Sequence, residues 1–533
     1  MIDKFTENKA QAMSDYLDWA TTERDTASGN ETADAPRGAA AASTRRQDLV
    51  RLILFGSASI AVYVLVFTVP YSIEVGLARP LLHFGHISAP TLGSTLAYVV
   101  AITTLFALYG GALRLCRRLE GWSAALITVV GLGGLAALAL LPMYPAFSLD
   151  VFYYMAADRI WIVYRENPFV VPPLQIPQDP FFPYTSWGHY ALPYGPLWPW
   201  ITAATSAATG GSVPATLLTF KALGVLGYLG SSLLVCWAAK LHPDRRVTAC
   251  CVFAWNPLVL LELAGNAHND AIALVPAALA LGLWARRASR SVAIALAVSY
   301  LVKATVIVLA PALLWGSLRR AINHRRLPSW ILTHLLPSAV LIAAAWLPFW
   351  NERSAAGLLR EADQYYMSVT ALAIAPFDQP WRGAAARVIQ AVLLVGYALY
   401  FRSQLRDLAS EGPRALNATW KLTTFYFLLV APFYSAWYMV WLTLLAAIIA
   451  DRRVAVLTTL LCLGGLSTYV VQFVVGPLIP SLASAQINAL GVLAASGPFL
   501  LGLWLGHRLG FFPAVGSATL DSASAQWAEV PAR

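Results

Sequence analysis

Long uninterrupted apolar runs constrain this chain more than any other feature. The run from Val454 to Val475, for example, contains no charged residue, and the whole chain of 533 residues is 58% hydrophobic and 12% charged. A soluble domain carries about 25% charged residues. In lipid every backbone polar group must be paired internally, which leaves helices or a closed barrel, and continuous apolar runs favour helices. The sequence therefore predicts an all-α polytopic membrane protein.

The distribution of charge predicts the topology. Residues 1–48 are polar and are expected to be a disordered cytoplasmic tail, residues 49–510 a transmembrane domain, and residues 511–533 a flexible cytoplasmic tail. Basic clusters between apolar runs are expected in the cytoplasm, and they lie at 45–51, 114–118, 286–290, 319–326, 402–406 and 452–453. This pattern predicts about 12 to 14 membrane helices.

One apolar stretch has basic clusters on both sides. Residues 291–318 must then enter and leave the membrane on the cytoplasmic side, so we expect two short helices that meet in a turn near Lys303 to Thr305. A similar conflict affects residues 194–246, where either one segment is re-entrant or the charge rule fails.

Two long loops are predicted on the extracytoplasmic face, at about 143–192 and 349–383. The first is rich in proline and aromatic residues, a composition that favours short helices at the membrane interface. Because the polar run at 266–270 is expected on the same face, the candidate functional residues converge there. The protein is expected to be a multi-pass protein of the cell membrane.

Asp150 follows the third apolar span directly, in Ser148–Leu149–Asp150. A carboxylate at the lip of a membrane cavity can act as a general base toward an incoming hydroxyl. It can equally cap the helix that follows, where the dipole favours an acid. Arg159, nine residues further on, either clamps a phosphate through its fork of donors or anchors the helix at the interface.

Lys303 lies within an apolar run with no acidic neighbour in sequence. A lysine at membrane depth costs about 2.5–3.5 kcal/mol on insertion scales, so such residues usually face a water-filled cavity or a fixed anion. The alternative is that the side chain snorkels, which its distance from either basic flank disfavours.

His268, Asn269 and Asp270 form a third polar group. They can orient a sugar through hydrogen bonds or simply begin the helix that follows; one histidine and one carboxylate do not make a metal site. Glu262 lies in the preceding apolar run and needs a buried partner.

Several familiar motifs do not occur in the sequence. It contains no GxxxxGK[ST] phosphate loop, no HExxH and no GxSxG elbow, and no soluble nucleotide-binding domain is expected. No basic stretch is interleaved with aromatics on a polar surface, which excludes nucleic acid as a partner. The five cysteines lie in or beside apolar segments, form no CxxC pair, and are expected to be unpaired packing residues.

Several segments, taken in order, resemble membrane-embedded glycosyltransferases of the GT-C superfamily. The resemblance runs from about residue 50 to 510 and is greatest to actinobacterial-type mannosyltransferases that use polyprenyl-phosphate mannose. The segments that carry it are Ser148–Leu149–Asp150–Val151–Phe152–Tyr153–Tyr154, Asn167–Pro168–Phe169, Tyr194–Gly195–Pro196–Leu197–Trp198, Trp255–Asn256–Pro257–Leu258 through His268–Asn269–Asp270, and Leu301–Val302–Lys303–Ala304–Thr305.

This resemblance implies a GT-C-like bundle and an inverting transfer of a sugar, mannose first, on the extracytoplasmic face. The donor is a polyprenyl-phosphate sugar and the acceptor a hydroxyl of a glycan or glycolipid. Asp150 maps onto the catalytic base, while Lys303 and Arg159 fit the cations that hold the donor phosphate. His189, Tyr194, His268, Asn269 and Asp270 are candidates for binding the sugar or acceptor.

A monophosphate donor held by cations needs no obligatory metal, so neither a metal nor another cofactor is expected. The alternative function is a transporter or flippase of lipid-linked sugars. It predicts inverted repeats, and the loop at 143–192 has no counterpart in the second half of the chain.

Overall fold

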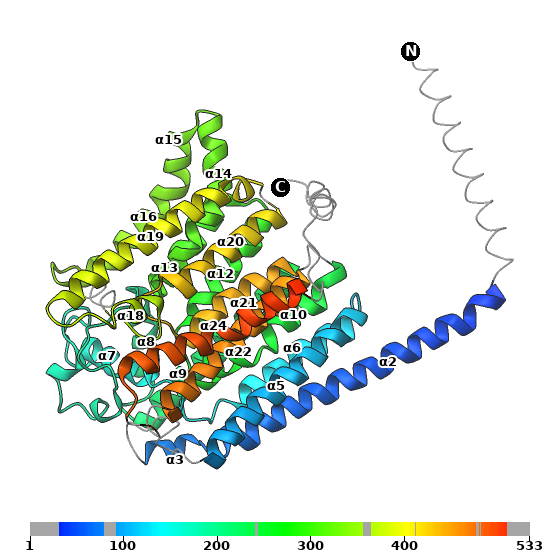
Figure 1. The fold of residues 1–533 in the computed structure, drawn as a ribbon, viewed down its shortest axis with the longest axis horizontal. Coiled ribbons are helices and arrows are strands. Elements are labelled where there is room, and N and C mark those ends of the chain that lie inside the picture. Colours follow the sequence, from blue (N-terminus) through cyan, green and yellow to red (C-terminus); the bar gives the residue numbers. More distant parts are fainter. Residues whose placement is uncertain are drawn as a thin grey trace.

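The structure is a computed structural model that describes residues 31–78, 92–239, 243–354, 364–410, 412–475, 479 and 481–508. Every regular element within these ranges is a helix, and no strand longer than an isolated bridge occurs in them. The long helices lie side by side along one common direction, as Figure 1 shows. The predicted all-α polytopic fold is confirmed.

The principal α-helices are listed here in chain order. They are α2 (Glu31–Val62), α3 (Ile73–Leu77), α5 (Leu92–Arg118), α6 (Ser123–Ala139), α7 (Asp150–Ile162), α8 (Leu197–Ala207), α9 (Val213–Ala238), α10 (Arg246–Ala254), α11 (Pro257–Leu260), α12 (Asp270–Ala285), α13 (Ser289–Val302), α14 (Ala310–Asn323), α15 (Leu327–Trp330), α16 (Leu336–Trp346), α18 (Val369–Ala373), α19 (Trp381–Leu408), α20 (Pro413–Phe425), α21 (Met439–Ile449), α22 (Arg452–Val470) and α24 (Ser484–Arg508).

Short 3₁₀ and π-helical turns extend or join these helices. Those used below are η6 (Leu261–Gly265), η7 (Ala304–Val308), η8 (Ile331–Leu335), η11 (Tyr426–Val430), η12 (Ala436–Tyr438) and η13 (Val471–Val475). The helix α2 reaches back to Glu31, into the segment predicted as a tail. Residues 1–30 and the predicted tail 511–533 lie outside the described residues.

Length and composition identify the segments that can span a membrane. In the described residues seven helices are long and apolar enough, or eight if the bent pair Arg246–Ala254 and Pro257–Gly265 is one span. Four shorter apolar helices add to these: Ser123–Ala139, Asp270–Ala285, Ser289–Val302 and Ala436–Ile449. The predicted number of 12 to 14 membrane helices stays a prediction.

The helix α8 resolves the conflict over residues 194–246. It has 11 residues and is about 16 Å long, which is too short to span a bilayer, whereas α9 is long enough. A single crossing, by α9, then suffices between the first long loop and Arg245 and Arg246, and their cytoplasmic location stays a prediction.

Contacts between distant segments bring the basic clusters to one end of the bundle. Arg118, at the end of α5, lies 3.8 Å from Asp48 of α2. Glu120 accepts hydrogen bonds from the backbone amides of Val247 and Thr248, both at 2.8 Å, and so caps α10. Arg245 donates to the carbonyl of Ala450, at the end of α21. In Figure 1 this end lies opposite α7 and α8.

The bend between α10 and α11 follows from the sequence Asn256–Pro257. Asn256 is in an extended conformation and its side chain accepts from the amides of Leu258 and Val259. Pro257 has no N–H to lose at the first position of the new helix. The two pieces meet at 49°, and the second ends as the π-helical turn η6 just before the polar group at 266–270.

The predicted break near Lys303 is confirmed. Lys303 ends α13 in an extended conformation (φ −149°, ψ 130°), and a 3₁₀ turn separates it from α14. The loop after the first aromatic segment packs on this break, since the Gly195 amide donates to the Val302 carbonyl. A Cβ at Gly195 would lie 2.2 Å from the Leu301 carbonyl oxygen, so no larger residue fits there.

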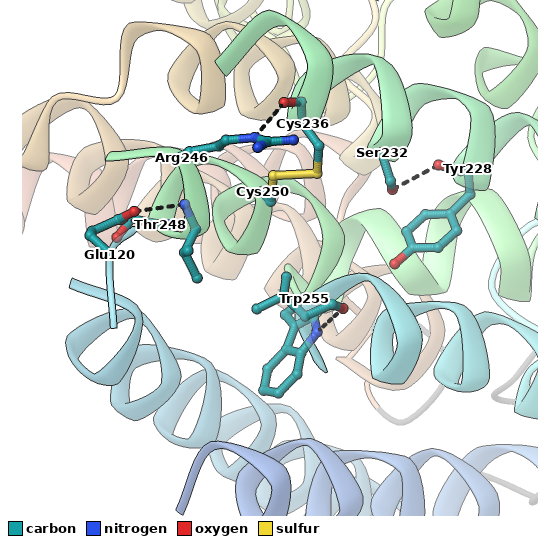
Figure 2. Close-up of a disulfide and its surroundings, with 10 residues drawn as sticks. Glu120, Tyr228, Ser232, Cys236, Arg246, Thr248, Cys250 and Trp255 are labelled. Atoms are coloured by element: carbon teal, nitrogen blue, oxygen red, sulfur yellow. Dashed lines mark hydrogen bonds between the residues drawn. A yellow bond between two sulfur atoms is a disulfide. The ribbon is translucent and has the colours of Figure 1, made fainter. Parts of the chain in front are cut away.

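The prediction that all cysteines are unpaired is wrong for two of them. Cys236, near the end of α9, forms a disulfide with Cys250 of α10, while Cys116, Cys251 and Cys462 are free and buried. Figure 2 shows this disulfide beside the bond from Arg246 to the Cys236 carbonyl. The turn between the two helices brings the Cα atoms to 5.2 Å, and a spacing of 14 residues gives no sign of that proximity.

Candidate functional site

Asp150 is the first residue of α7, but its side chain does not cap that helix. The residue at the cap position is Leu149, which makes no side-chain bond. The Asp150 carboxylate instead accepts from the indole N–H of Trp187, at 2.9 Å, in the first long loop. Only 10% of the side chain is exposed. The carboxylate is therefore held by a residue far along the chain and directed away from its own helix.

His268 lies between two carboxylates. Its Nδ1 is 3.6 Å from Asp150 Oδ2, and its Nε2 is 3.2 Å from Glu262 Oε2. Neither ring nitrogen has a hydrogen bond of good geometry to any described residue. The ring is fully buried and stacks on Trp437, with centroids 4.1 Å apart.

The second of these carboxylates, Glu262, is completely buried in η6. The Tyr469 hydroxyl donates to Oε1 at 2.8 Å, and the Asn266 amide donates to Oε2 at 2.9 Å. Glu262 thus has the buried partners that a carboxylate in an apolar run requires.

Lys303 is paired with the polar group at 266–270, although Asp270 lies 33 residues earlier in the chain. Its ammonium donates to Asp270 Oδ2 at 2.6 Å and to Asn269 Oδ1 at 3.0 Å, and it lies 5.5 Å from the centre of the Tyr194 ring. The indole of Trp441 donates to Asp270 Oδ1 at 2.8 Å. Lys303 therefore does not snorkel; a buried carboxylate fixes it.

The structure does not bring Arg159 to these residues. The Arg159 guanidinium contacts both oxygens of Asp179, at 2.7 and 3.0 Å, and lies over the Phe181 ring. His189 is exposed. Neither side chain is among those that line the cavities described next. Arg159 instead holds the loop at 163–192 through its contact with Asp179.

Two cavities meet at Asp150. The larger has a volume of about 1080 Å³ and includes Lys303, Tyr194 and Arg387 in its wall. The smaller measures about 550 Å³ and is bounded by aromatic rings of α22, η13 and neighbouring loops. The residues common to both walls are Asp150, Trp187, Tyr190, Gln364, Tyr365, Phe433 and Trp437.

Sequence reasoning missed several residues of this site. Trp437 and Trp441 are ordinary members of an aromatic-rich apolar run, and no local pattern pairs them with residues some 170 positions earlier. Lys221 could have been found, because it interrupts the apolar run of α9 just as Lys303 interrupts its own. Fully buried, it donates to the carbonyls of Ala264 and Gly265 at the end of η6.

In the described part of the chain no group of three or more His, Cys, Asp or Glu side chains is placed to hold a metal ion. That a metal is not required stays a prediction.

Fold and site together define a polytopic, all-helical membrane protein in which one buried carboxylate, Asp150, lies in the walls of two adjoining cavities. The model of one family, described as "Alpha-(1->6)-mannopyranosyltransferase, N-terminal domain", matches residues 52–319. The chain belongs to this family, whose members are named as glycosyltransferases. The matched range contains Asp150, Glu262, His268, Asp270 and Lys303.

Three curated relatives match shorter segments. Alpha-(1->6)-mannopyranosyltransferase A of Mycobacterium tuberculosis is 28% identical over 255 residues, 46% of each chain. A second alpha-(1->6)-mannopyranosyltransferase of M. tuberculosis is 29% identical over 154 residues, 26% of this chain and 24% of the relative. A probable one of Mycolicibacterium smegmatis is 29% identical over 137 residues, 24% of each. The matched segments thus span between a quarter and a half of the relatives' lengths.

Proposed function

We propose that this protein is a membrane mannosyltransferase that moves mannose from a polyprenyl-phosphate donor to a hydroxyl of a glycan or glycolipid, with inversion. Asp150 acts as the general base, and the reaction takes place on the extracytoplasmic face. The family supports mannose as the sugar. The observation that carries the donor class is the shape and chemistry of the larger cavity.

This cavity follows one face of α19. The residues that α19 contributes recur every three to four positions, as expected for one face of a helix: Arg387, Gln390, Ala391, Leu394, Tyr397, Ala398 and Phe401. From the first to the last is 14 residues, or about 21 Å of helix. A hexose is much shorter than that, so a long ligand is required to fill the cavity.

Polarity changes along this face. It begins with the guanidinium of Arg387 and continues through Leu394 to Phe401. Apolar residues from the other walls include Ile307, Val308, Pro311, Phe427 and Val430. Because α19 is also largely exposed along its apolar window, lipid can reach the cavity from the side. An isoprenoid chain with a phosphate at its polar end has the matching chemistry.

The position of Asp150 suits a base between two substrates. A donor in the larger cavity and an acceptor in the smaller one would approach each other where the two walls share Asp150 and Trp187. The carboxylate can then accept the hydroxyl proton as the acceptor oxygen attacks C1. Arg387 in the wall of the donor cavity can bind the donor phosphate, and Lys303 lies in the same wall, paired with Asp270.

Sidedness is supported by the basic clusters. Those at α2, α5, α10 and α22 gather at the end of the bundle opposite α7, so the positive-inside rule puts Asp150 outside the cytoplasm. Nucleotide sugars are cytoplasmic, and a lipid-linked donor is then the one available.

The direct test is transfer by the purified protein in liposomes. We expect labelled mannose to pass from polyprenyl-phosphate mannose to neutral alkyl glycosides, and none from a nucleotide-linked mannose. Transfer from the nucleotide donor alone would contradict the proposal. Movement of the lipid donor across the bilayer with no transfer would favour the flippase instead.

Labelling of single cysteines tests sidedness separately. In a cysteine-free background, Pro180→Cys should react with an impermeant maleimide on intact spheroplasts, and Arg118→Cys only after lysis. The reverse pattern would place the site in the cytoplasm and remove the case for a lipid donor.

A further inference from the structure

Asp150, His268 and Glu262 form a buried cluster in which one imidazole lies between two carboxylates. His268 lies between the two carboxylates, at 3.6 and 3.2 Å, and is fully buried. Glu262 is fully buried as well, and Asp150 is only 10% exposed. Two carboxylates this close, with little solvent, repel each other strongly.

The groups in contact with the three residues are neutral. Trp437 stacks on the ring, Trp187 donates to Asp150, and Tyr469 and Asn266 donate to Glu262. Two buried lysines lie on neighbouring elements: Lys303 is paired with Asp270 at 2.6 Å, and Lys221 is bonded to the carbonyls of Ala264 and Gly265. Of the side chains that contact the two carboxylates, His268 is therefore the one that can carry a positive charge.

The positions of the ring nitrogens are compatible with a positive charge on His268, because each lies close to a carboxylate oxygen, at 3.6 and 3.2 Å, without a hydrogen bond of good geometry. A neutral imidazole has one N–H, and the lone pair of its other nitrogen would lie beside a carboxylate oxygen. An imidazolium has an N–H on both nitrogens, one on the side of each carboxylate. With His268 neutral the three residues carry a charge of −2, and with His268 protonated they carry −1.

We propose that His268 is an imidazolium that holds Asp150 in its ionised, proton-accepting form beside the buried Glu262. His268 is in this sense a positioning residue: it lines neither cavity and touches no substrate. The inference rests on the proposed function, since it concerns the base of that reaction.

The charge of the cluster changes during the transfer step, and the imidazolium allows Asp150 to take up the proton. As the acceptor oxygen bonds to C1, the C1–O bond to phosphate breaks and its electron pair leaves with the phosphate. The hydroxyl proton goes to Asp150, so the cluster passes from −1 to neutral. Without the imidazolium, the two carboxylates would compete for a proton before the acceptor arrives, and in every molecule in which that proton is on Asp150 the base would be blocked.

Three variants separate charge from packing: His268→Gln, Glu262→Gln and the double variant. We expect His268→Gln to lower kcat about 100-fold, within the range attributed to a general base, with the KM for donor and acceptor unchanged. Glu262→Gln should lower kcat less. The double variant returns the cluster to −1, its wild-type charge, and should recover kcat at least tenfold over His268→Gln.

A matched control is available elsewhere in the bundle. His334 of η8 is also a buried histidine stacked on a tryptophan, Trp330, at 4.9 Å, and is remote from both cavities. His334→Gln should leave kcat unchanged. If it lowers kcat as much as His268→Gln does, the loss at 268 reports packing alone, and the proposal is wrong.

The outcomes also separate this inference from the proposed function. Failure of the wild-type protein to transfer mannose would refute the function. An active wild type with an unimpaired His268→Gln, or with a double variant no better than the single one, would refute only the role of His268. If His268→Gln cannot be purified folded but the double variant can, the uncompensated charge is again responsible. If neither folds, His268 serves packing and the proposal is overturned.

Discussion

His268 and Asp270 lie two residues apart on the same bend, yet their surroundings differ. Asp270 is completely bonded: Lys303 and Trp441 each donate to one of its oxygens, at 2.6 and 2.8 Å. His268 has no hydrogen bond of good geometry to the described residues, and faces two carboxylates instead. A closed ion pair fixes the structure, whereas a cluster with an incomplete set of bonds can still gain or lose a proton.

The backbone of the bend holds both side chains in place. Lys221 of α9 donates to the last carbonyls of η6, which have no helical partner. Gly224 lets α9 approach this turn, since a Cβ there would lie 2.3 Å from the Leu263 carbonyl oxygen. The same backbone contacts therefore support His268 and Asp270, and the two residues differ in the side chains that surround them.

The largest effect is expected from Asp150→Asn, which removes the carboxylate next to His268. An amide of the same shape keeps a carbonyl oxygen for the Trp187 bond but accepts no proton, so kcat should fall about 10²- to 10⁴-fold. Thermal unfolding in detergent should be unchanged. Wild-type transfer by this variant would show that the base lies elsewhere.

Lys303→Met removes the ion pair between Lys303 and Asp270. It leaves Asp270 buried and without its cation, which should destabilise the fold by about 3–5 kcal/mol. Lys303→Met combined with Asp270→Asn should recover most of that loss. Lys303→Arg should not, because the guanidinium fork does not fit a site shaped for an ammonium. Thermal unfolding of the purified variants measures all three, and a stable Lys303→Met would contradict the role of the pair.

Asp158 adds another buried carboxylate to the comparison, eight residues after Asp150 in α7. Burial raises the pKa of the Asp158 carboxyl to about 6, although Thr202 donates to it at 2.8 Å. Because folding favours the protonated form, the fold loses stability as the pH rises from about 4 to 6, and the loss is complete above pH 6. Asp158→Asn should remove this pH dependence and raise the unfolding temperature at pH 7.5. An unchanged pH profile of stability would show that Asp158 does not titrate there.

Arg387→Gln is expected to have the smallest effect. Arg387 is exposed, at the polar end of the face of α19 that lines the donor cavity. Its loss should raise the KM for the donor about two- to fivefold, as for one exposed ionic contact, and leave kcat nearly unchanged. Arg382→Gln, one turn earlier on α19 and not in the cavity wall, is the matched control. Equal effects of the two variants would assign them to surface charge alone.

Much of the architecture could be predicted from the sequence because it follows from short-range physics. Apolar runs without charge require helices in lipid, and arginine clusters mark one end of them. The break at Lys303 could be predicted because basic clusters lie on both sides of residues 291–318. Both clusters are expected in the cytoplasm, and the stretch between them is too short for two full-length membrane helices. Ionisable residues in or beside apolar runs are costly to bury, and this made four residues of the site recognisable: Asp150, His268, Asp270 and Lys303.

What the sequence could not supply was the pairing of those residues. Lys303 and Arg159 were both assigned to the donor phosphate, but Asp270 binds one and Asp179 the other. The disulfide between Cys236 and Cys250 and the contact of Trp441 with Asp270 were equally invisible. Each joins elements whose distance depends on how whole helices pack.

The sequence by itself determined that this chain folds as a helical bundle in a membrane, and which residues are costly to bury there. These properties follow from hydropathy, charge and proline, which act within a few residues. Only the tertiary structure decided that Asp270 is neutralised while His268 lies between Asp150 and Glu262. A buried charge is compensated by whichever side chain reaches it, and that is set by contacts between segments 33 to 171 residues apart in the chain.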